Sequence, residues 1–271
     1  TQPGNRLRIY TKDPGEKGYL FEDDEWHQVK FKVTDNNGNS SFLSFKVKSS
    51  AKRKTFDLPA HDQMFVYNRK NYFETETLKL EFPVNSFYNN VFFTYSQQEP
   101  QDHMFSDIHV IHTPSTPVHK YFTLSIKEIE LPVYLRNKAL IVHIDEDNEY
   151  NAKGGFYSDG FIETKSRDFG KYAVMVDTVA PVIKKKVFPP KANQDSLLYM
   201  KFTIQDDLSG IERYDGYIDG KWALFEYDAK NDELTYYLDP GKLIQGKKHE
   251  LVLTVSDERK NVTELKTFFE Y

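Results

Sequence analysis

The sequence predicts an all-β protein made of tandem β-sandwich modules. Its first indication is a repeat: residues 26–47 recur at a constant offset as residues 248–269, and both copies alternate apolar with polar residues on either side of an Asp/Asn turn. This pattern is typical of a β-hairpin that buries one face. Aromatic residues make up 15% of the 271-residue chain, which favours strands over helices. We therefore expect a row of related β-modules, with no helix of ordinary length.

The bulk composition excludes several classes of protein. A chain of this length has room for about two to three domains. Its net charge of −5 argues against nucleic acid or anionic lipid as the main partner, and no apolar run reaches the roughly 18 residues of a transmembrane helix. The absence of cysteine excludes disulfides, thiolate zinc sites and a cysteine nucleophile. Because the sequence opens on Thr1 without an initiator Met or a signal peptide, we expect a processed product or a fragment.

Residues 1–49 are expected to form an incomplete first module. They contain RLRIY, GYLF and the first copy of the hairpin. These make about four strands, whereas a complete sandwich of the immunoglobulin type needs about seven. We interpret this segment as the C-terminal half of a β-sandwich. The polar, charged stretch SSAKRK, residues 49–54, then acts as a connector.

Residues 55–178 are expected to form a middle β-sandwich. Pro, Asn, Asp and Gly separate its short alternating segments at the spacing of a sandwich, and these segments are MFVYN, LKLEFP, VFFTYS, HKYFTLSI, ALIVHI, GGFYSDGFIET and KYAVMVD. Pro114, Pro117 and Pro132 exclude regular central strand at their positions, because proline cannot donate a hydrogen bond to the ladder. We expect KYAVMVD to be the final strand of this module.

Residues 179–271 are expected to form a complete C-terminal module of immunoglobulin-like type. The linker DTVAPVI, residues 177–183, leads into it. About six or seven strands follow within roughly 90 residues, which is the density of a small sandwich. The pair Gly220-Lys221 in IDGKW predicts a tight turn between two of these strands.

Several motifs along the chain resemble those of one family. They are PGNRLRIY with the hairpin after it, KYFTLSI, LRNKALIV, SRDFGKYAVMVDTVAPVI and, in the third segment, DDLSGI, YIDGKW and EYDAKND. Together they resemble the C-terminal region of cell-envelope peptidases from Gram-negative anaerobes, in which a lysostaphin-type zinc endopeptidase domain precedes β-sandwich modules. The resemblance covers nearly the whole chain and is most specific in the third segment. It implies a periplasmic or cell-surface protein that acts near peptidoglycan.

The zinc site of that family has no counterpart in this sequence. Such a site needs an H-x-H pair on one strand, whose alternate side chains reach the same metal. The chain has eight histidines and no two of them are separated by a single residue. The H-E-x-x-H motif is also absent, because Leu253 stands where the second histidine would follow His249 and Glu250. The resemblance therefore transfers a location but no active-site residue, and we expect neither catalysis nor a cofactor.

Four histidines crowd a short loop-rich stretch: His103, His109, His112 and His119. A metal site could be drawn from them, but their spacing matches no known ligand pattern. We favour the interpretation that they are scattered surface histidines.

Four carboxylates stand at expected strand ends or in the linker: Asp177, Asp206, Asp207 and Asp257. If those strand ends meet at the pole where the linker enters, their oxygens could converge on Ca²⁺, as happens between tandem extracellular modules. Asp and Asn also form Asx-turns at strand ends without any metal. We favour turn formation, because Asp35 repeats the pattern in the first hairpin where no partner carboxylate is evident.

The third segment is rich in aromatic residues that could stack on a sugar. Candidate ligand-binding residues are Tyr214, Tyr217 and Trp222, with Phe225 and Tyr227 nearby. Strand alternation divides these rings between two faces and predicts that Trp222 points inward beside Leu224. Packing in the core and across strands is therefore the favoured interpretation.

These observations predict a non-catalytic array of immunoglobulin-like modules from a cell-envelope peptidase-like protein. Its role would be to position a peptidoglycan hydrolase, or to bind a cell-wall polymer or a partner envelope protein. The alternative is a free-standing carbohydrate-binding protein or adhesin. Coplanar exposed aromatics would favour the alternative, and a buried interface between modules would favour a rigid spacer.

The tripeptides 177–179 and 195–197 resemble a periplasmic O-glycosylation signal and so point to export. The oligomeric state stays open.

Overall fold

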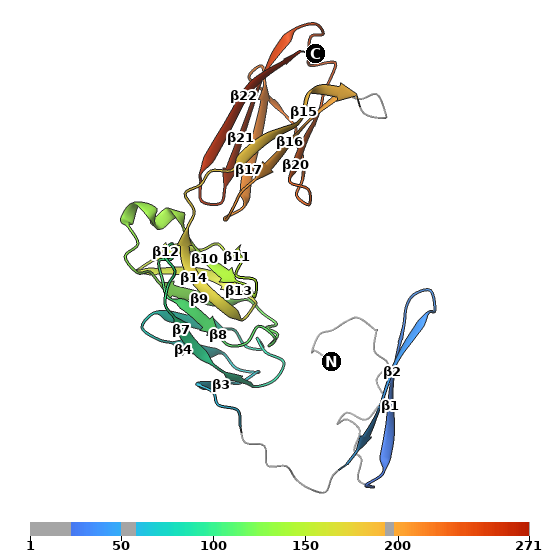
Figure 1. Ribbon diagram of the computed structural model, residues 1–271, viewed down its shortest axis with the longest axis vertical. Coiled ribbons are helices and arrows are strands. Elements are labelled where there is room, and N and C mark those ends of the chain that lie inside the picture. The colour runs from blue at the N-terminus through green and yellow to red at the C-terminus, as the bar shows by residue number, and fades with distance from the viewer. Residues whose placement is uncertain (1–22, 50–57, 193–197, 271) are drawn as a thin grey trace. The chain divides into compact units, whose positions relative to one another are not determined.

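The protein is almost entirely β-structure (Figure 1). The computed structural model describes residues 23–49, 58–192 and 198–270. Over this part of the chain it contains 22 strands and one short 3-10 helix, η1 (Val133–Lys138). The strands pair antiparallel, so the predicted all-β class is confirmed. Contacts divide the chain into two compact units, residues 1–59 and residues 60–271.

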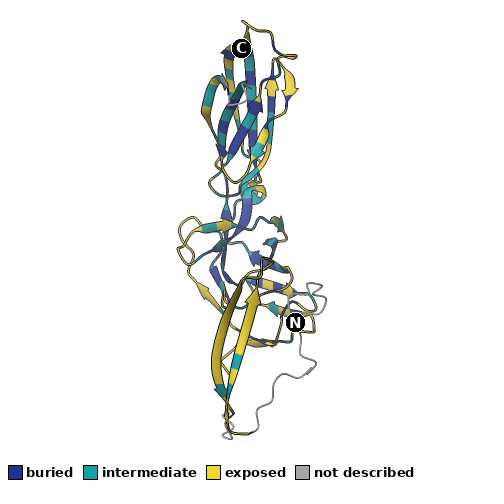
Figure 2. Cartoon of the chain, turned by 90° about the vertical axis from the view of Figure 1, so that its right-hand side faces the viewer, coloured by how far each residue is buried: buried dark blue, intermediate teal, exposed yellow. Residues whose placement is uncertain are grey.

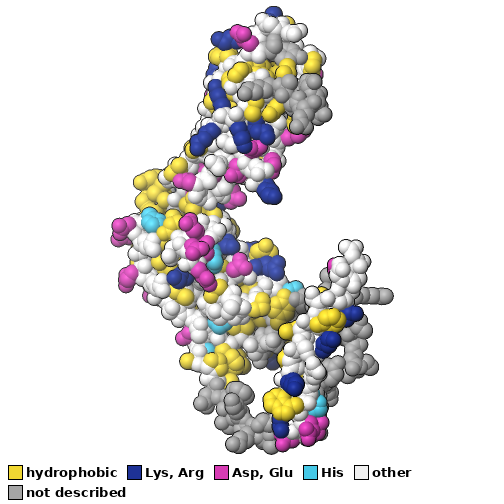
Figure 3. All heavy atoms as spheres, turned by 45° about the vertical axis from the view of Figure 1, so that its right-hand side comes forward, with side chains coloured by type: hydrophobic (Ala, Val, Ile, Leu, Met, Phe, Trp, Pro, Cys, Tyr) yellow, Lys and Arg dark blue, Asp and Glu magenta, His cyan; other side chains and the backbone are white. Residues whose placement is uncertain are grey.

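The described part of the first unit is one β-hairpin. β1 (Trp26–Thr34) pairs with β2 (Ser40–Lys48) along their whole length, with Phe31 opposite Leu43. Both of these apolar side chains are more than half exposed, at 55% and 61%. The hairpin is mostly exposed in Figure 2, and hydrophobic and lysine side chains lie side by side on its surface in Figure 3. The segments RLRIY and GYLF, which we predict to be strands, lie outside the described residues.

The middle sandwich packs two five-stranded sheets face to face. One sheet has the order β12-β13-β9-β5-β4, and the other has the order β11-β10-β14-β8-β7. A short β3-β6 ladder lies beside them. The strands are β3 (Gln63–Phe65), β4 (Asn71–Glu74), β5 (Leu78–Phe82), β6 (Val91–Phe93), β7 (Tyr95–Gln98), β8 (Ile108–Ile111), β9 (Phe122–Lys127), β10 (Ala139–Ile144), β11 (Tyr150–Ala152), β12 (Phe156–Ser158), β13 (Phe161–Ser166) and β14 (Gly170–Val176).

The core of the middle sandwich is built from phenylalanine rings. Phe65, Phe82, Phe93 and Phe122 have no exposed surface, and the ring centroids of the pairs Phe65–Phe93 and Phe82–Phe122 lie 4.5 Å apart. Aromatic pairs at this separation add specific attraction to the burial of apolar area. Strand alternation places these side chains inward, as the period of two in the sequence predicts. The three prolines named above lie outside every strand, as expected.

The C-terminal sandwich packs two four-stranded sheets. Their orders are β15-β16-β20-β19 and β18-β17-β21-β22. Leu251, Leu253 and Val255 alternate along β21 and are completely buried. The predicted tight turn is present, with Asp219 and Gly220 at positive φ between β17 and β18. The strands are β15 (Val182–Ala192), β16 (Leu198–Gln205), β17 (Ile211–Ile218), β18 (Lys221–Ala223), β19 (Glu226–Asp228), β20 (Glu233–Tyr237), β21 (Lys248–Asp257) and β22 (Val262–Glu270).

The two copies of the repeated segment fold as the same hairpin. Phe31 faces Leu43 across β1–β2, and Leu253 faces Leu265 across β21–β22, which is the same register. The turns are also alike, because the opening aspartate accepts the same kinds of hydrogen bond in each. The prediction of one hairpin written twice is confirmed.

Candidate functional site

The linker between the two sandwiches is held at its first residue. Asp177 follows β14 and is only 2% exposed. Its N–H donates to the carbonyl of Lys138 in the middle sandwich (3.0 Å), and its Oδ2 accepts from the N–H of Ser209 in the C-terminal sandwich (3.1 Å). Its Oδ1 accepts from the N–H of Val179 (3.0 Å) in an Asx-turn. Asp177 therefore bonds to the middle sandwich through its backbone N–H and to the C-terminal sandwich through its side chain.

Asp206 stands directly after β16. Its Oδ2 accepts from the N–H groups of Leu208 (3.2 Å) and Gly210 (2.7 Å), so it closes the loop that leads to β17. Its Oδ1 is buried and has no hydrogen-bond partner. Burial raises the pKa of Asp206 above its usual value, and the neighbouring carboxylates of Asp177 and Asp257 add to that rise.

Asp257 ends β21 and is completely buried. Its Oδ1 accepts from the N–H groups of Arg259 (2.7 Å) and Asn261 (2.9 Å), and its Oδ2 accepts from the side-chain amide of Asn261 (2.7 Å). The Asn261 amide also donates to the backbone carbonyl of Asp177 (3.0 Å). The turn that opens the last strand is therefore bonded to the linker. These bonds confirm the prediction that Asp257 is a turn-forming residue.

The structure brings three of the four predicted carboxylates together. One oxygen each from Asp177, Asp206 and Asp257 lies within 4.8 Å of the others, and we call this group the carboxylate centre. It is the one group of three or more possible metal-ligating side chains found in residues 23–49, 58–192 and 198–270. Asp207, the fourth candidate, is exposed and lies outside the group.

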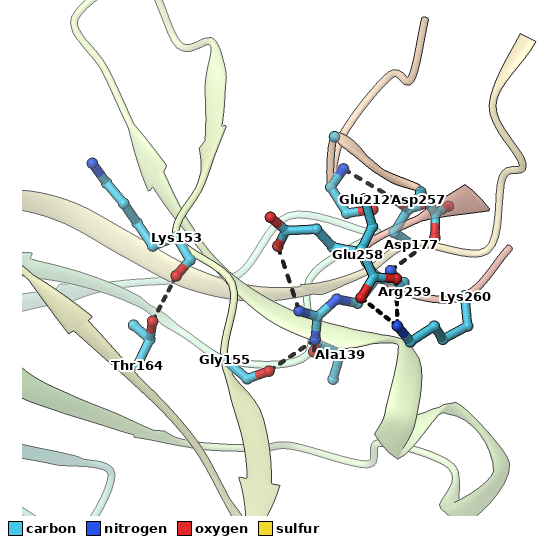
Figure 4. A network of polar contacts seen from close by, with 12 residues as sticks. Ala139, Lys153, Gly155, Thr164, Asp177, Glu212, Asp257, Glu258, Arg259 and Lys260 are labelled. Carbon is cyan, nitrogen blue, oxygen red and sulfur yellow. Dashed lines mark hydrogen bonds and ion pairs between the residues drawn. The ribbon is translucent and has the colours of Figure 1, made fainter. Parts of the chain in front are cut away.

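Basic side chains tie the two modules together around this centre (Figure 4). The Nη1 of Arg259 donates to the carbonyls of Ala139 (2.9 Å) and Gly155 (2.8 Å) in the middle sandwich, and its side chain is only 12% exposed. In the opposite direction, the Nζ of Lys138 in the middle sandwich donates to two acceptors of the C-terminal sandwich. These are Asn261 Oδ1 (2.6 Å) and the carbonyl of Arg259 (2.6 Å). Sequence reasoning missed Arg259 and Lys138, because charged residues near turns are common and carry no local signal of a distant partner.

An apolar contact supports the same junction. Leu140, Val142 and Ala173 form a buried cluster on the face of β10 and β14 that is turned away from the main core. Leu208, from the loop closed by Asp206, packs against this cluster. The C-terminal module thus places a side chain on the outer sheet surface of the middle module.

The aromatic side chains of the third segment are not buried and exposed in the way that the sequence predicts. Trp222 is 61% exposed, so the expectation that it points inward beside Leu224 is wrong, and Leu224 is exposed as well. The buried positions of this hairpin are Gly216, Ile218 and Ala223, and Gly216 faces Ala223 across β17–β18. A Cβ atom on Gly216 would collide with the ring of Phe225, which fills the space above it. Gly216 therefore leaves room for Phe225, and Trp222 faces outward because it is next to the buried Ala223 on the strand.

Trp222 forms part of a surface pocket of about 270 Å³. Lys221, Tyr236, Tyr237 and Lys242 also line this pocket. Tyr217 faces Trp222 across the strand pair and is 37% exposed. Tyr214 instead packs on the core beside Tyr227, with ring centroids 5.5 Å apart. Only two of the three proposed ligand-binding aromatics therefore share an exposed surface.

The four clustered histidines have separate partners. His103, His112 and His119 lie near Tyr150, Thr94 and Tyr88 respectively. His109 is completely buried, so its assignment to the surface is wrong. Its Nδ1 lies 2.8 Å from the hydroxyl of Tyr95, and burial lowers its pKa to about 4.

Comparison with known proteins adds one match. A search of curated proteins found no significant similarity to this chain. Within the described residues, no helix is long and apolar enough to span a bilayer. Residues 62–177 match the model of the Zu5-like domain. This match spans the middle sandwich and ends at Asp177 of the carboxylate centre, so the middle module of this chain is similar to a Zu5-like domain.

Proposed function

We propose that this chain is a non-catalytic module array of a cell-envelope peptidase-like protein, and that it positions a peptidoglycan hydrolase or binds the wall or a partner protein. The resemblance of the third segment to such proteins supports this proposal. The match to a Zu5-like domain supports a binding or adhesion role for the middle module. A periplasmic or cell-surface location follows from the same proposal.

The observation that carries the proposal is the buried junction between the two sandwiches. A spacer can hold a second domain in place only if its own joints resist bending. Modules joined by a polar linker move relative to each other by default. Here Asp177 is buried between the modules and the Arg259 side chain donates to two carbonyls of the preceding module. Bending this joint would break those hydrogen bonds, each of which contributes about 0.5–1.5 kcal/mol net.

Distance measurements across the joint test this role. The chain has no cysteine, so spin labels attach only at introduced sites such as Tyr121→Cys and Ile244→Cys, both at exposed positions of the two sandwiches. We expect electron–electron resonance to give one narrow distance distribution, and Arg259→Ala to broaden it. Arg213→Ala is the matched control, because Arg213 is exposed and pairs with Asp215 in its own module. A broad distribution in the unsubstituted chain would contradict a rigid spacer.

A second candidate function is carbohydrate binding by the C-terminal module. It is favoured by the exposed indole of Trp222 beside a pocket that also offers lysine and tyrosine side chains. Exposed tryptophan supplies a rigid apolar face with a polar edge, which suits stacking on a sugar ring. Co-sedimentation with purified peptidoglycan sacculi tests it. Trp222→Ala should reduce sedimentation, whereas Trp26→Ala, at the other exposed tryptophan, should not. Equal sedimentation of both variants would exclude this site.

A further inference from the structure

The carboxylate centre brings three carboxyl groups together, and two of them have almost no contact with solvent. Asp177 is 2% exposed and Asp257 is not exposed at all. Like charges at this separation in a buried environment repel each other strongly. Among the ion pairs of the described residues, none includes Asp177, Asp206 or Asp257. Lys138 and Arg259, the basic side chains that bridge the two modules, donate to carbonyl and amide oxygens instead. Within residues 23–49, 58–192 and 198–270, no basic side chain therefore forms an ion pair with the centre.

Two buried oxygen atoms, one in the centre and one in the neighbouring Ser209, also have no hydrogen-bond partner. Asp206 Oδ1 is buried without a hydrogen-bond partner although the other oxygen of the same carboxylate accepts two. The hydroxyl Oγ of Ser209 is buried without a partner as well, and Ser209 is only 6% exposed. The N–H of Ser209 binds Asp177 Oδ2, so this residue forms part of the wall of the centre. Buried oxygens without partners are rare and costly, and they require an explanation.

We propose that the carboxylate centre binds a calcium ion. Asp177, Asp206 and Asp257 each supply a carboxylate oxygen, and the Ser209 hydroxyl is available as a further oxygen. A donor set of oxygen atoms alone selects a hard cation over zinc or copper. Calcium is favoured over magnesium because it accepts irregular coordination, whereas magnesium demands near-octahedral geometry. The cation supplies the missing positive charge and satisfies the unpartnered Asp206 oxygen.

The position of the ion gives it a mechanical role. Its ligands come from the linker, from the loop after β16 and from the turn after β21. These three segments are also those that contact the middle sandwich. Calcium would therefore stiffen the joint between the modules. This site does not depend on the proposed function, since a module array with any role could contain it.

Calorimetric titration of the whole chain tests the site. After treatment with a chelator, the unsubstituted protein should bind one Ca²⁺ per chain, and its melting temperature should rise with calcium concentration. Asp206→Asn should weaken calcium binding at least tenfold, because it removes one charge and the unpartnered ligand oxygen. Asp207→Asn is the matched control, since Asp207 is the adjacent residue, is exposed and lies outside the centre. It should bind calcium as the unsubstituted chain does.

The metal-free proteins provide a second readout that does not depend on calcium affinity. In chelator, Asp206→Asn should melt at or above the temperature of the unsubstituted chain. The amide carbonyl can still accept from Leu208 and Gly210, while the amide N–H group can donate to a neighbouring carboxylate. A variant that fails only because it unfolds would melt lower.

Three results would overturn the proposal. They are the absence of any binding heat or melting shift in millimolar calcium, unchanged calcium affinity in Asp206→Asn, and an equal loss of affinity in Asp207→Asn. A magnesium response as large as the calcium response would overturn the assignment to calcium.

Discussion

At the scale of single residues, two buried histidines have opposite electrostatics. His249 in the C-terminal sandwich places Nδ1 2.6 Å from a carboxylate oxygen of Asp219 and Nε2 3.0 Å from the carbonyl of Ile244. Both ring nitrogens face acceptors, so the charged imidazolium is favoured, and the hydrogen bond with Asp219 raises the pKa of His249. His109 in the middle sandwich has only the hydroxyl of Tyr95 and an unpartnered Nε2, so burial keeps it neutral.

His249 predicts a specific dependence of stability on pH. Its pKa is raised in the folded state, so it contributes stability that is fully present below its unfolded value of about 6.5 and is lost as pH rises through the folded value. We expect the difference in melting temperature between the native chain and His249→Gln to be larger at pH 5.5 than at pH 8.5. Thermal unfolding followed by circular dichroism at both values measures it. A difference that is independent of pH would show that His249 is neutral in the folded protein.

At the scale of elements, the repeated hairpin shows how neighbours decide burial. β1–β2 and β21–β22 share register and turn, but β21 also pairs with β17. Leu253 is consequently buried in a sandwich core, whereas its counterpart Phe31 is more than half exposed. The same local pattern therefore gives a hairpin with one buried face in the C-terminal sandwich, which we call the covered copy. In the described part of the first unit it gives an exposed hairpin, which we call the open copy.

Truncation of a side chain in the covered copy should be costly. Leu253→Ala should lower the free energy of unfolding of the C-terminal sandwich by about 2–5 kcal/mol, because Leu253 has no exposed surface and its removal leaves a cavity. Urea denaturation measures the change. Leu224→Ala is the control, since Leu224 is 62% exposed and its truncation should cost less than about 0.5 kcal/mol. Comparable losses in both variants would contradict the burial pattern.

The open copy predicts a partner for the first hairpin. Exposed apolar residues on a strand pair are unfavourable in water and invite pairing. We expect residues 1–49 either to pack on the middle module or to pair with a second chain. In either case the amides of residues 26–47 should exchange slowly in the whole chain. If their exchange rate falls as protein concentration rises, the hairpin pairs with a second chain. Rapid exchange along the entire hairpin would count against both.

At the scale of the whole molecule, the proposed absence of catalysis is testable. No two histidines of the 271 residues are separated by one residue, and the carboxylate centre is a group of three aspartates without a histidine. We expect the purified chain to release no muropeptides from peptidoglycan and to cleave no peptide, with or without zinc. Chromatography of digested sacculi measures this. Release of muropeptides that requires zinc and is abolished by a chelator would contradict this prediction.

Local features of this protein could be read from the sequence. Alternation and turn residues predicted the strands, the repeat predicted two equal hairpins, and Asp35 and Asp257 form the expected turns. These features are local because a period of two and an Asx-turn depend on residues close in the chain.

Two features could be seen only in the tertiary structure: which distant residues meet, and which face of a strand is buried. The meeting of Asp177, Asp206 and Asp257 joins residues up to 80 positions apart, and the sequence only named them as candidates. The same holds for Arg259, whose acceptor Ala139 lies in the preceding module. Trp222 illustrates the second feature. The alternation of side chains along a strand shows which residues share a face, but it does not show which face is buried in the core. Here the face with Gly216 and Ala223 meets the core, and the ring of Phe225 packs so close to Gly216 that a Cβ atom there would collide with it.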